Sequence, residues 1–334
     1  MTEAIRNPEP TDGPRFVRVD PDRQREAIGL LLSGRASGRE AAVQPFLDYA
    51  RQQSLVLDDL WVAVEGETLQ AAVLIVPCRG RSGMLFCSPA TSWPSEQLAV
   101  ELLRTACRAQ STDRMRLIQC LLDPPQRRLA GAMRDAGFHD LATLKYMSRR
   151  LNRRPRPRSL AGRLPGYRVL HWDDGPVDDF ARPILDSYEQ TLDCPGLRGL
   201  RSIDDVIVGH QSAGVFRPDL WHAIYDDQTP VGAMLINDLP HMDACELVYL
   251  GLAVPYRGQG LGKQLLEHAL DLVHAAGRGS MILAVDERNE PATRLYRGAG
   301  FRETASKRAM VYAFGQPIET SPDEVSRDAD GRRP

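Results

Sequence analysis

The chain has 334 residues and a formal net charge of −2, and 43% of its residues are hydrophobic and 26% charged. This length predicts two domains, and the near-zero charge gives no overall field that would attract nucleic acid or a membrane surface. No apolar run reaches the roughly 20 residues that a membrane-spanning helix needs. We therefore expect a globular, cytoplasmic protein with neither nucleic acid nor membrane as a partner.

The six cysteines form no Cys-x-x-Cys pair, and no His/Cys cluster has the spacing of zinc ligands. Most of them stand in apolar stretches, as buried free thiols do in a reducing compartment. We expect free thiols and no metal site.

In chain order, the sequence predicts a polar leader over residues 1–14 and then an N-terminal domain over 15–148. Residues 149–166 read RRLNRRPRPRSLAGRLPG, and their prolines exclude a continuous helix while the arginines keep the segment solvated. This basic, Pro-rich linker leads to a C-terminal domain over 167–314. The polar, aperiodic residues 315–334 are predicted to be a disordered tail.

The two halves of the sequence repeat each other. Leu60-Trp61-Val62-Ala63 matches Leu220-Trp221-His222-Ala223 at an offset of 160, and Ala136-Gly137-Phe138 matches Ala299-Gly300-Phe301 at 163. An insertion or deletion of three residues near 77–83 explains the change of offset. The repeat predicts a tandem duplication of one α/β unit.

The second copy shows alternating strand and helix patterns. Strands are predicted over 167–171, 220–225, 231–237, 246–254, 281–285 and 307–314. Helices are predicted over 177–192, 260–276 and 290–299, the second with apolar residues that step by three or four. Strands interleaved with helices predict an α/β fold.

The strongest chemical signal is the loop between the strand at 246–254 and the helix at 260–276. It reads Arg257-Gly258-Gln259-Gly260-Leu261-Gly262-Lys263. Glycines allow positive φ and the close approach of a ligand, and the first amides of a helix have no partner within it. Such a turn binds phosphate groups. Its glycine spacing differs from that of nucleoside triphosphatase and dinucleotide-binding loops.

Arg257-x-x-Gly260-x-Gly262 after an apolar strand resembles the acetyl-CoA signature of the GNAT superfamily of N-acetyltransferases. Asn289 and Tyr296 follow seven residues apart, and Ala299-Gly300-Phe301 comes next. The resemblance covers roughly 167–314, and the two-domain plan is similar to that of mycothiol synthase. It implies two tandem GNAT-like domains, each a mixed, mostly antiparallel sheet flanked by helices.

The resemblance also implies an activity and a role for each site residue. The activity is direct attack of a primary amine, on a small molecule or a protein, on acetyl-CoA in the C-terminal domain. Asn289 would hydrogen-bond the pantetheine arm, and Tyr296 would protonate the departing CoA thiolate. Backbone amides would hold the pyrophosphate at Arg257, Gly258, Gln259, Gly260, Leu261, Gly262 and Lys263, and the central strand would pair with pantetheine at Leu252 and Val254.

Several residues are candidates for the general base and for the acceptor site. Glu246, at the start of the central strand, is the first candidate base and Asp286 the second. Asp286 recurs as Asp123 in the first copy, which favours a capping role. Residues that could line the site or meet the acceptor are His222, Tyr249, Tyr188, Glu189, Asp193 and Cys194, and the acidic ones would suit a cationic amine.

The first copy has lost these chemical signals. At the offset of 163, none of the loop glycines remains and the tyrosine becomes a methionine, which cannot donate a proton. We expect the first copy to keep the fold without catalysing. The replacements are Pro94, Ser95, Gln97 and Ala99 in the loop, Met133 for Tyr296, Gln126 for Asn289 and Gly83 for Glu246.

Two alternatives stay open on the sequence alone. The chain could be a catalytically silent CoA-binding regulatory or scaffold protein, or it could transfer a different acyl group. The retained loop, Asn289 and Tyr296 favour the enzyme. The sequence does not decide the acceptor, the acyl chain length or the oligomeric state.

Overall fold

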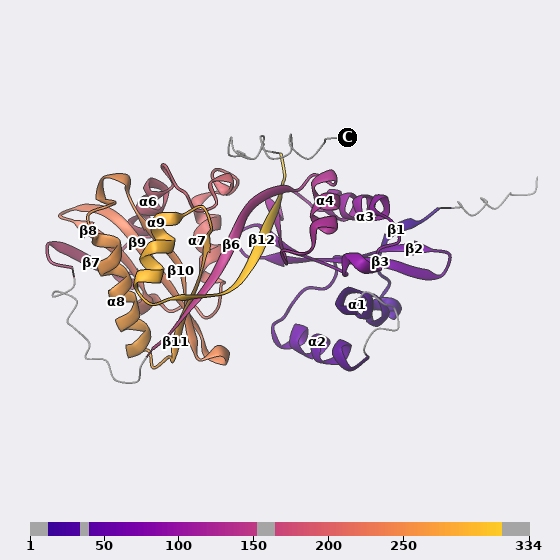
Figure 1. Cartoon of the computed structure of the whole chain (residues 1–334), viewed down its shortest axis with the longest axis horizontal. Helices are drawn as coiled ribbons and strands as arrows, with labels where there is room; N and C mark the ends of the chain where they lie inside the picture. Colours follow the sequence, from indigo (N-terminus) through magenta and orange to yellow (C-terminus); the bar gives the residue numbers. More distant parts are fainter. Residues whose placement is uncertain (1–12, 34–39, 152–163, 316–334) are drawn as a thin grey trace, which may run out of the picture. The chain divides into compact units, whose positions relative to one another are not determined.

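The structure is a computed structural model that describes residues 13–33, 40–151 and 164–315 (Figure 1). The chain forms two compact units. The first contains the chain up to Val76 with residues 85–110 and 126–137, and the second contains residues 77–84, 111–125 and the chain from Phe138 onward. The predicted leader and tail, and residues 152–163 of the predicted linker, fall almost wholly outside the described residues.

The first unit is a small antiparallel sheet with helices. β1 (Arg15–Arg18), β2 (Leu60–Glu65) and β3 (Thr68–Cys78) pair in that order. Buried aliphatic side chains of α1 (Gln24–Ser33) pack against β2 and β3. The remaining helices are α2 (Glu40–Gln52), α3 (Glu96–Arg108) and α4 (Arg127–Asp135).

The second unit is built on a long, mixed sheet in the order β5-β12-β6-β11-β10-β9-β8-β7, and residues 82–84, the first half of β4, pair with β5. Among its described pairs, β4–β5 and β10–β11 are parallel and the others antiparallel. This architecture confirms the predicted mixed, mostly antiparallel α/β class. The strands are β4 (Ser82–Cys87), β5 (Leu117–Leu122), β6 (His139–Arg150), β7 (Tyr167–His171), β8 (Trp221–Asp226), β9 (Thr229–Leu239), β10 (Ala244–Leu252), β11 (Ser280–Asp286) and β12 (Arg302–Ala313).

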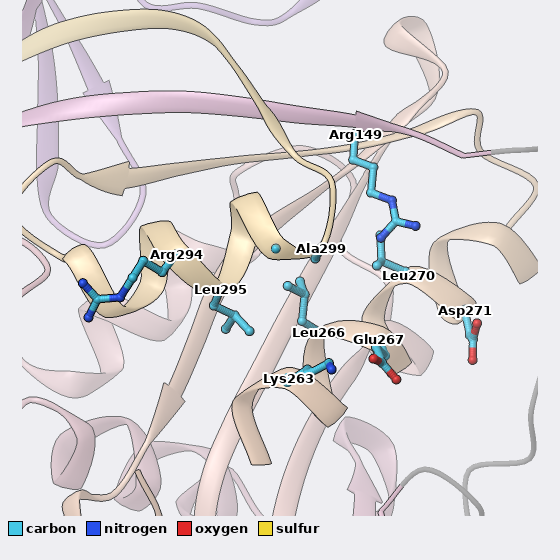
Figure 2. A pocket seen from close by; sticks show the side chains of 10 residues that line it. Arg149, Lys263, Leu266, Glu267, Leu270, Asp271, Arg294, Leu295 and Ala299 are labelled. Atoms are coloured by element: carbon cyan, nitrogen blue, oxygen red, sulfur yellow. The ribbon is translucent and has the colours of Figure 1, made fainter. Parts of the chain in front are cut away.

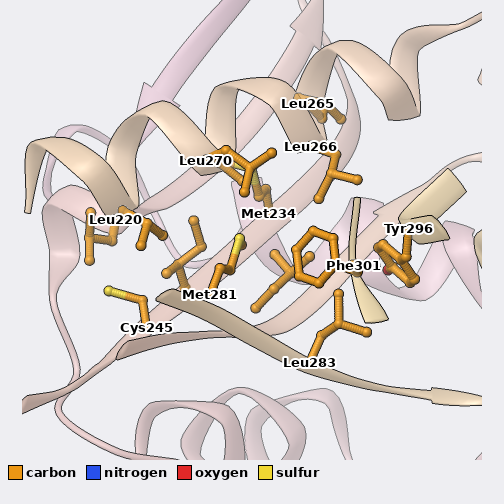
Figure 3. Close-up of a cluster of buried hydrophobic side chains, with 14 of the residues drawn as sticks. Leu220, Met234, Cys245, Leu265, Leu266, Leu270, Met281, Leu283, Tyr296 and Phe301 are labelled. Atoms are coloured by element: carbon orange, nitrogen blue, oxygen red, sulfur yellow. The ribbon is translucent and has the colours of Figure 1, made fainter. Parts of the chain in front are cut away.

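Helices cover both faces of β7–β11. The apolar stripe of α8 (Leu261–Ala275) and part of α9 (Glu290–Gly298) bury one face, where Leu265, Met281 and Phe301 meet (Figure 3). On the other face, Phe180 and Ile184 of α6 (Asp178–Ser187) pack with α7 (Ile203–Gln211) over β8 and β9. Successive side chains of a strand point to opposite faces of the sheet, so alternate residues pack into the two cores.

The duplication is visible in the element bounds. α4 and α9 differ by an offset of 163, and so do β6 and β12. The first strand pair, β2 and β8, is offset by 161, one residue more than the predicted 160. The shared Leu-Trp stretch is therefore shifted by one residue relative to the strand that contains it.

The two copies exchange their last strands within the second unit. β6, from the first copy, lies between β11 and β12, and β12 lies between β6 and β5. Residues 111–125 and 138–148, predicted to lie in the N-terminal domain, therefore belong to the same compact unit as the second copy. The pairing between copies explains why the compact units differ from the division at residues 149–166.

None of the described helices combines the length and the apolarity needed to cross a membrane.

Candidate functional site

A gap opens in the sheet beside β10. β10 pairs in parallel with β11 only from Ala244 to Glu246, whereas it stays on β9 as far as Leu252. The β9 ladder shifts register between Leu247 and Tyr249. A cavity of about 370 Å³ lies along this gap, lined by residues 247–252, the end of α6 and the loop after it, α7 and α9.

The open edge of β10 offers backbone groups to a ligand. The Ala253 amide donates to the Val231 carbonyl across 2.9 Å, so by alternation the polar groups of Leu252 face the open side. The Leu252 carbonyl already accepts from Arg257 Nε at 2.9 Å, and the Val254 carbonyl accepts from the Arg257 amide at 3.2 Å. Neither bond uses the Leu252 amide, which remains on the open side of the strand.

The glycine loop has the geometry of an anion site. Gly258 has φ +75° and Gly260 has φ +86°, so both adopt the left-handed conformation that glycine allows. Gly260 caps α8 with its backbone alone, and its carbonyl accepts from the amides of Lys263 and Gln264. In the described chain, no partner is recorded for the amides of residues 258–262. Backbone amides in such a turn form a concavity for anions.

The Arg257 side chain has a different task from its backbone. Its guanidinium donates to the carbonyls of Leu252 (2.9 Å), Ser187 (2.7 Å) and Gln190 (3.4 Å). These bonds join the loop to the end of β10 and the end of α6. The arginine of the sequence signature therefore positions the loop, and the amides that follow it are the groups free for phosphate.

Tyr296 lies on α9 and lines the cavity. Its ring packs at 5.9 Å from that of Phe301 and its side chain is 8% exposed. Burial, with the nearby Asp193 charge, raises the pKa of the phenol far above its usual range, so the hydroxyl is neutral at pH 7. No hydrogen-bond partner is recorded for that hydroxyl within the described residues, which leaves its proton available to a ligand.

Asn289 and the aspartates support the cavity wall. Asn289 Oδ1 caps α9 by accepting from the Ala292 amide at 3.2 Å. Asp193 accepts from the Asp286 amide at 2.8 Å, and Asp286 accepts from the Cys194 amide at 3.2 Å. The fully buried Asp286 carboxylate is also bound by Arg288. These contacts give Asp286 a structural role.

Glu246 is not among the residues that line the cavity. Its neighbours Cys245 and Leu247 belong to the core beneath α8, so its side chain points to the face covered by α6 and α7. Burial raises the pKa of this carboxyl. Of the predicted acceptor-site residues, Tyr188, Asp193, Cys194 and Tyr249 line the cavity, whereas Glu189 does not.

The sequence interpretation missed α7, which brings His210 to the cavity. Burial and the nearby Arg201 charge lower the pKa of His210 to about 4, so the imidazole is neutral at pH 7. The signal for this helix was present: Ser202 accepts from the Asp205 amide at 3.2 Å as the N-cap, and Ser-x-x-Asp before an apolar run marks a helix start.

A second cavity of about 640 Å³ lies between α8 and α9 (Figure 2). It carries three cations, Lys263, Arg149 and Arg294, together with Glu267 and Asp271. Lys263 belongs both to this cavity and to the glycine loop, so the two sites are contiguous. Among the described residues, this cavity included, no group of three or more His, Cys, Asp or Glu side chains could hold a metal ion.

His222 lies away from the main cavity, in a buried histidine cluster. Its Nδ1 is 3.0 Å from His268 Nε2, and its ring is 4.5 Å from that of His171. Burial is the main cause that lowers the pKa of His222 to about 3, and the charges of the two other histidines lower it further. The ring is 1% exposed and therefore packs as a neutral group.

This cluster predicts acid sensitivity. The unfolded chain has a His222 pKa near 6.5 and binds more protons than the folded chain between that value and the folded pKa, so stability falls as pH drops through this window. For His222→Gln, we expect the free energy of unfolding lost between pH 7 and 4.5 to be smaller by roughly 2 kcal/mol than in wild type. Denaturant titrations at both pH values measure it. His241→Gln, at an exposed histidine, is the control, and an unchanged pH dependence in His222→Gln would contradict the assignment.

Comparisons with known proteins show which sequences this chain is similar to. The acetyltransferase (GNAT) family model matches residues 172–301. A 98-residue segment is 41% identical to peptidyl-lysine N-acetyltransferase YjaB of Salmonella typhimurium, covering 29% of this chain and 59% of that protein. Another of 111 residues is 31% identical to mycothiol acetyltransferase of Beutenbergia cavernae, covering 32% and 36%. The chain thus spans less than two thirds of the length of these relatives.

A crystal structure extends the likeness to nearly the whole chain. The GCN5-related N-acetyltransferase from Sphaerobacter thermophilus aligns with a TM-score of 0.60 over 93% of this chain and 98% of that chain. At 15% sequence identity, this likeness shows a shared fold.

Proposed function

From the premise that the chain contains a domain of the acetyltransferase (GNAT) family, we propose that it transfers the acetyl group of acetyl-CoA to a primary amine in its second half. The observation that carries the proposal is a juxtaposition. A glycine turn whose amides have no recorded partner in the described chain stands beside a cavity that holds an unbonded tyrosine hydroxyl. One group suits a diphosphate, and the other suits a departing thiolate.

The residues present fit acetyl-CoA. The amides of residues 258–262 would hold the pyrophosphate at the positive end of α8. Lys263 and Arg294 would attract the nucleotide phosphates in the adjoining cavity. The Leu252 amide would bind pantetheine, and Asn289, whose side chain lines the cavity, would meet the same arm. When bound, acetyl-CoA supplies the activated acyl group.

Tyr296 would donate its proton to the sulfur as the C–S bond breaks, which removes the cost of expelling a free thiolate. General acid help of this kind contributes roughly 10²–10⁴-fold. Holding both substrates in one cavity supplies further acceleration, because attack then becomes effectively unimolecular.

The amine must lose a proton before its nitrogen can attack. Glu246 stays our proposed base, and its raised pKa makes it a better acceptor of that proton. Because its side chain does not line the cavity, it would act through a bridging water. His210 is the second candidate, since it lines the cavity and is neutral at pH 7.

The first copy has physical features that would prevent it from binding the cofactor. At the start of α3, the Ser95 hydroxyl accepts from the Leu98 amide at 3.1 Å, so a side chain occupies one of the donors that an anion would need. Pro94 has no amide to offer. The glycines that would let a diphosphate approach are absent.

We therefore expect one acetyl-CoA site per chain. Calorimetric titration of the full chain should give a stoichiometry near one, and a screen of amines should reveal thioester consumption. Two sites per chain would show that both copies bind. Binding without consumption of any amine would favour the alternative of a catalytically silent CoA-binding protein, and faster consumption of another acyl-CoA would favour a different donor.

A further inference from the structure

The cavity carries an arginine for which the described part of the chain shows no carboxylate partner. Arg201 lines the cavity, is half-buried, and donates to the Gly80 carbonyl at 3.3 Å. No ion pair is recorded for it among the described residues. A guanidinium carries five N–H donors, so this single bond leaves most of its capacity unused. Burying a cation without a partner is costly, which indicates that an anion completes the site.

The nearby carboxylate of Asp205 is held elsewhere. Arg81 binds both Asp205 oxygens, with Nε at 2.9 and 3.0 Å and Nη2 at 2.6 Å. The Ser202 hydroxyl donates to the same carboxylate at 2.8 Å. Because both of its oxygens accept hydrogen bonds from other groups, Asp205 stabilises the Arg201 charge only at a distance and forms no ion pair with it.

The turn that carries Arg81 is fixed against α7. Gly80 has φ +74°, and a Cβ added to it would collide with the Asp205 carbonyl oxygen. On the helix, a Cβ added to Gly209 would lie 3.1 Å from Arg201 Nη1. Two glycines therefore make room for the contact between the turn at 79–82 and α7. This turn comes from the first copy and belongs to the second compact unit.

Arg201 stands at the acceptor end of the cavity. Its charge acts on Tyr188 and on His210, whereas the groups assigned to acetyl-CoA lie on β10, α9 and the glycine loop. Of the described residues that line the cavity, Asp193 is the carboxylate, and it accepts from the Asp286 amide. The exposed Arg198 adds a second cation. The acceptor end is therefore electropositive, which differs from the expectation that acidic residues there would bind a cationic amine.

We propose that the acceptor is a small primary amine that also carries a carboxylate, and that Arg201 binds this carboxylate. The inference rests on the proposed acetyl transfer and names its substrate class. A planar guanidinium pairs bidentately with a carboxylate, which fixes the orientation of the amine. The cavity of about 370 Å³ must also hold the thioester, so the acceptor is small.

The test compares amino acids with their decarboxylated amines in the full-length protein. The pairs are L-lysine with cadaverine and L-ornithine with putrescine, and release of the CoA thiol gives the rate. We expect kcat/KM to be roughly 10- to 100-fold higher for the amino acids. In Arg201→Gln this preference should vanish while the Kd of acetyl-CoA is unchanged. Arg182→Gln, at an exposed arginine on α6 paired with Asp186, should keep the preference.

Arg81 provides a second test because the side-chain hydrogen bonds recorded for it in the described chain all go to Asp205. Arg81→Ala releases the Asp205 carboxylate to pair with Arg201, so KM for the amino acids should rise several-fold with little change for the decarboxylated amines. The double variant Arg81→Ala/Asp205→Asn removes the competing charge and should restore the preference. A merely structural role for Arg81 would leave the double variant as impaired as the single one.

The outcomes separate the inference from the proposed function. Equal turnover of both members of each pair would overturn the carboxylate site and leave acetyl transfer standing. If acetyl-CoA binds but no amine is consumed, the carboxylate site is tested by calorimetric titration of the CoA-loaded protein with the amino acids. Binding that Arg201→Gln abolishes would support the carboxylate site and refute catalysis, and no binding would overturn both.

Discussion

Replacement of Gly260 by Asp is expected to abolish acetyl-CoA binding, with a rise in Kd of roughly 100-fold or more. Gly260 has φ +86°, and its missing Cβ faces open space, so the added carboxylate would stand where the diphosphate binds. The substitution brings like-charge repulsion and backbone strain at once. Calorimetric titration with acetyl-CoA measures the result.

The opposite end of the same helix supplies a control for strain. Gly277 has φ +75° and also faces open space, just after α8 ends. Gly277→Asp should destabilise the fold by a similar amount and leave acetyl-CoA binding intact. Gly260→Asn adds a side chain of similar size without charge, and should weaken binding less than the aspartate does. Equal loss of binding in both Asp variants would show that strain, rather than the anion site, explains the effect.

Replacement of Tyr296 by Phe is expected to lower kcat by roughly 10²–10⁴-fold with the Kd of acetyl-CoA nearly unchanged. The ring stays in place against Phe301. No hydrogen bond within the described chain is recorded for the hydroxyl, so its removal leaves no protein group unsatisfied and the melting temperature should hold. Stopped-flow release of the CoA thiol, with calorimetry for binding, checks both parts.

Tyr225→Phe is the matched control, since Tyr225 is also buried but does not line the cavity. It should retain full turnover. Full activity in Tyr296→Phe would remove this tyrosine from the acid role and would direct attention to a water or to another group. Lost binding would instead indicate that the phenol holds the cofactor.

The sequence by itself determined the parts of this protein that have local signatures. The glycine turn, the strand before it and the helix after it were predicted from composition and periodicity, because left-handed glycines and a helix start depend on neighbouring residues. Asp123 and Asp286 were related by the repeat, and the capping role expected for Asp286 agrees with its hydrogen bonds. The family resemblance over the second copy is confirmed by the family match to residues 172–301.

Other features were decided only by the tertiary structure. The exchange of β6 and β12 leaves no local trace, because each strand alternates in the same way whichever partner it pairs with. On the sequence alone, the Arg257 guanidinium was a candidate to bind phosphate. In the fold, it donates to three backbone carbonyls instead. Arg81, Asp205 and Arg201 meet over a separation of more than one hundred residues. Sequence patterns report local backbone preference, whereas the charge balance of a cavity depends on which distant side chains already satisfy one another.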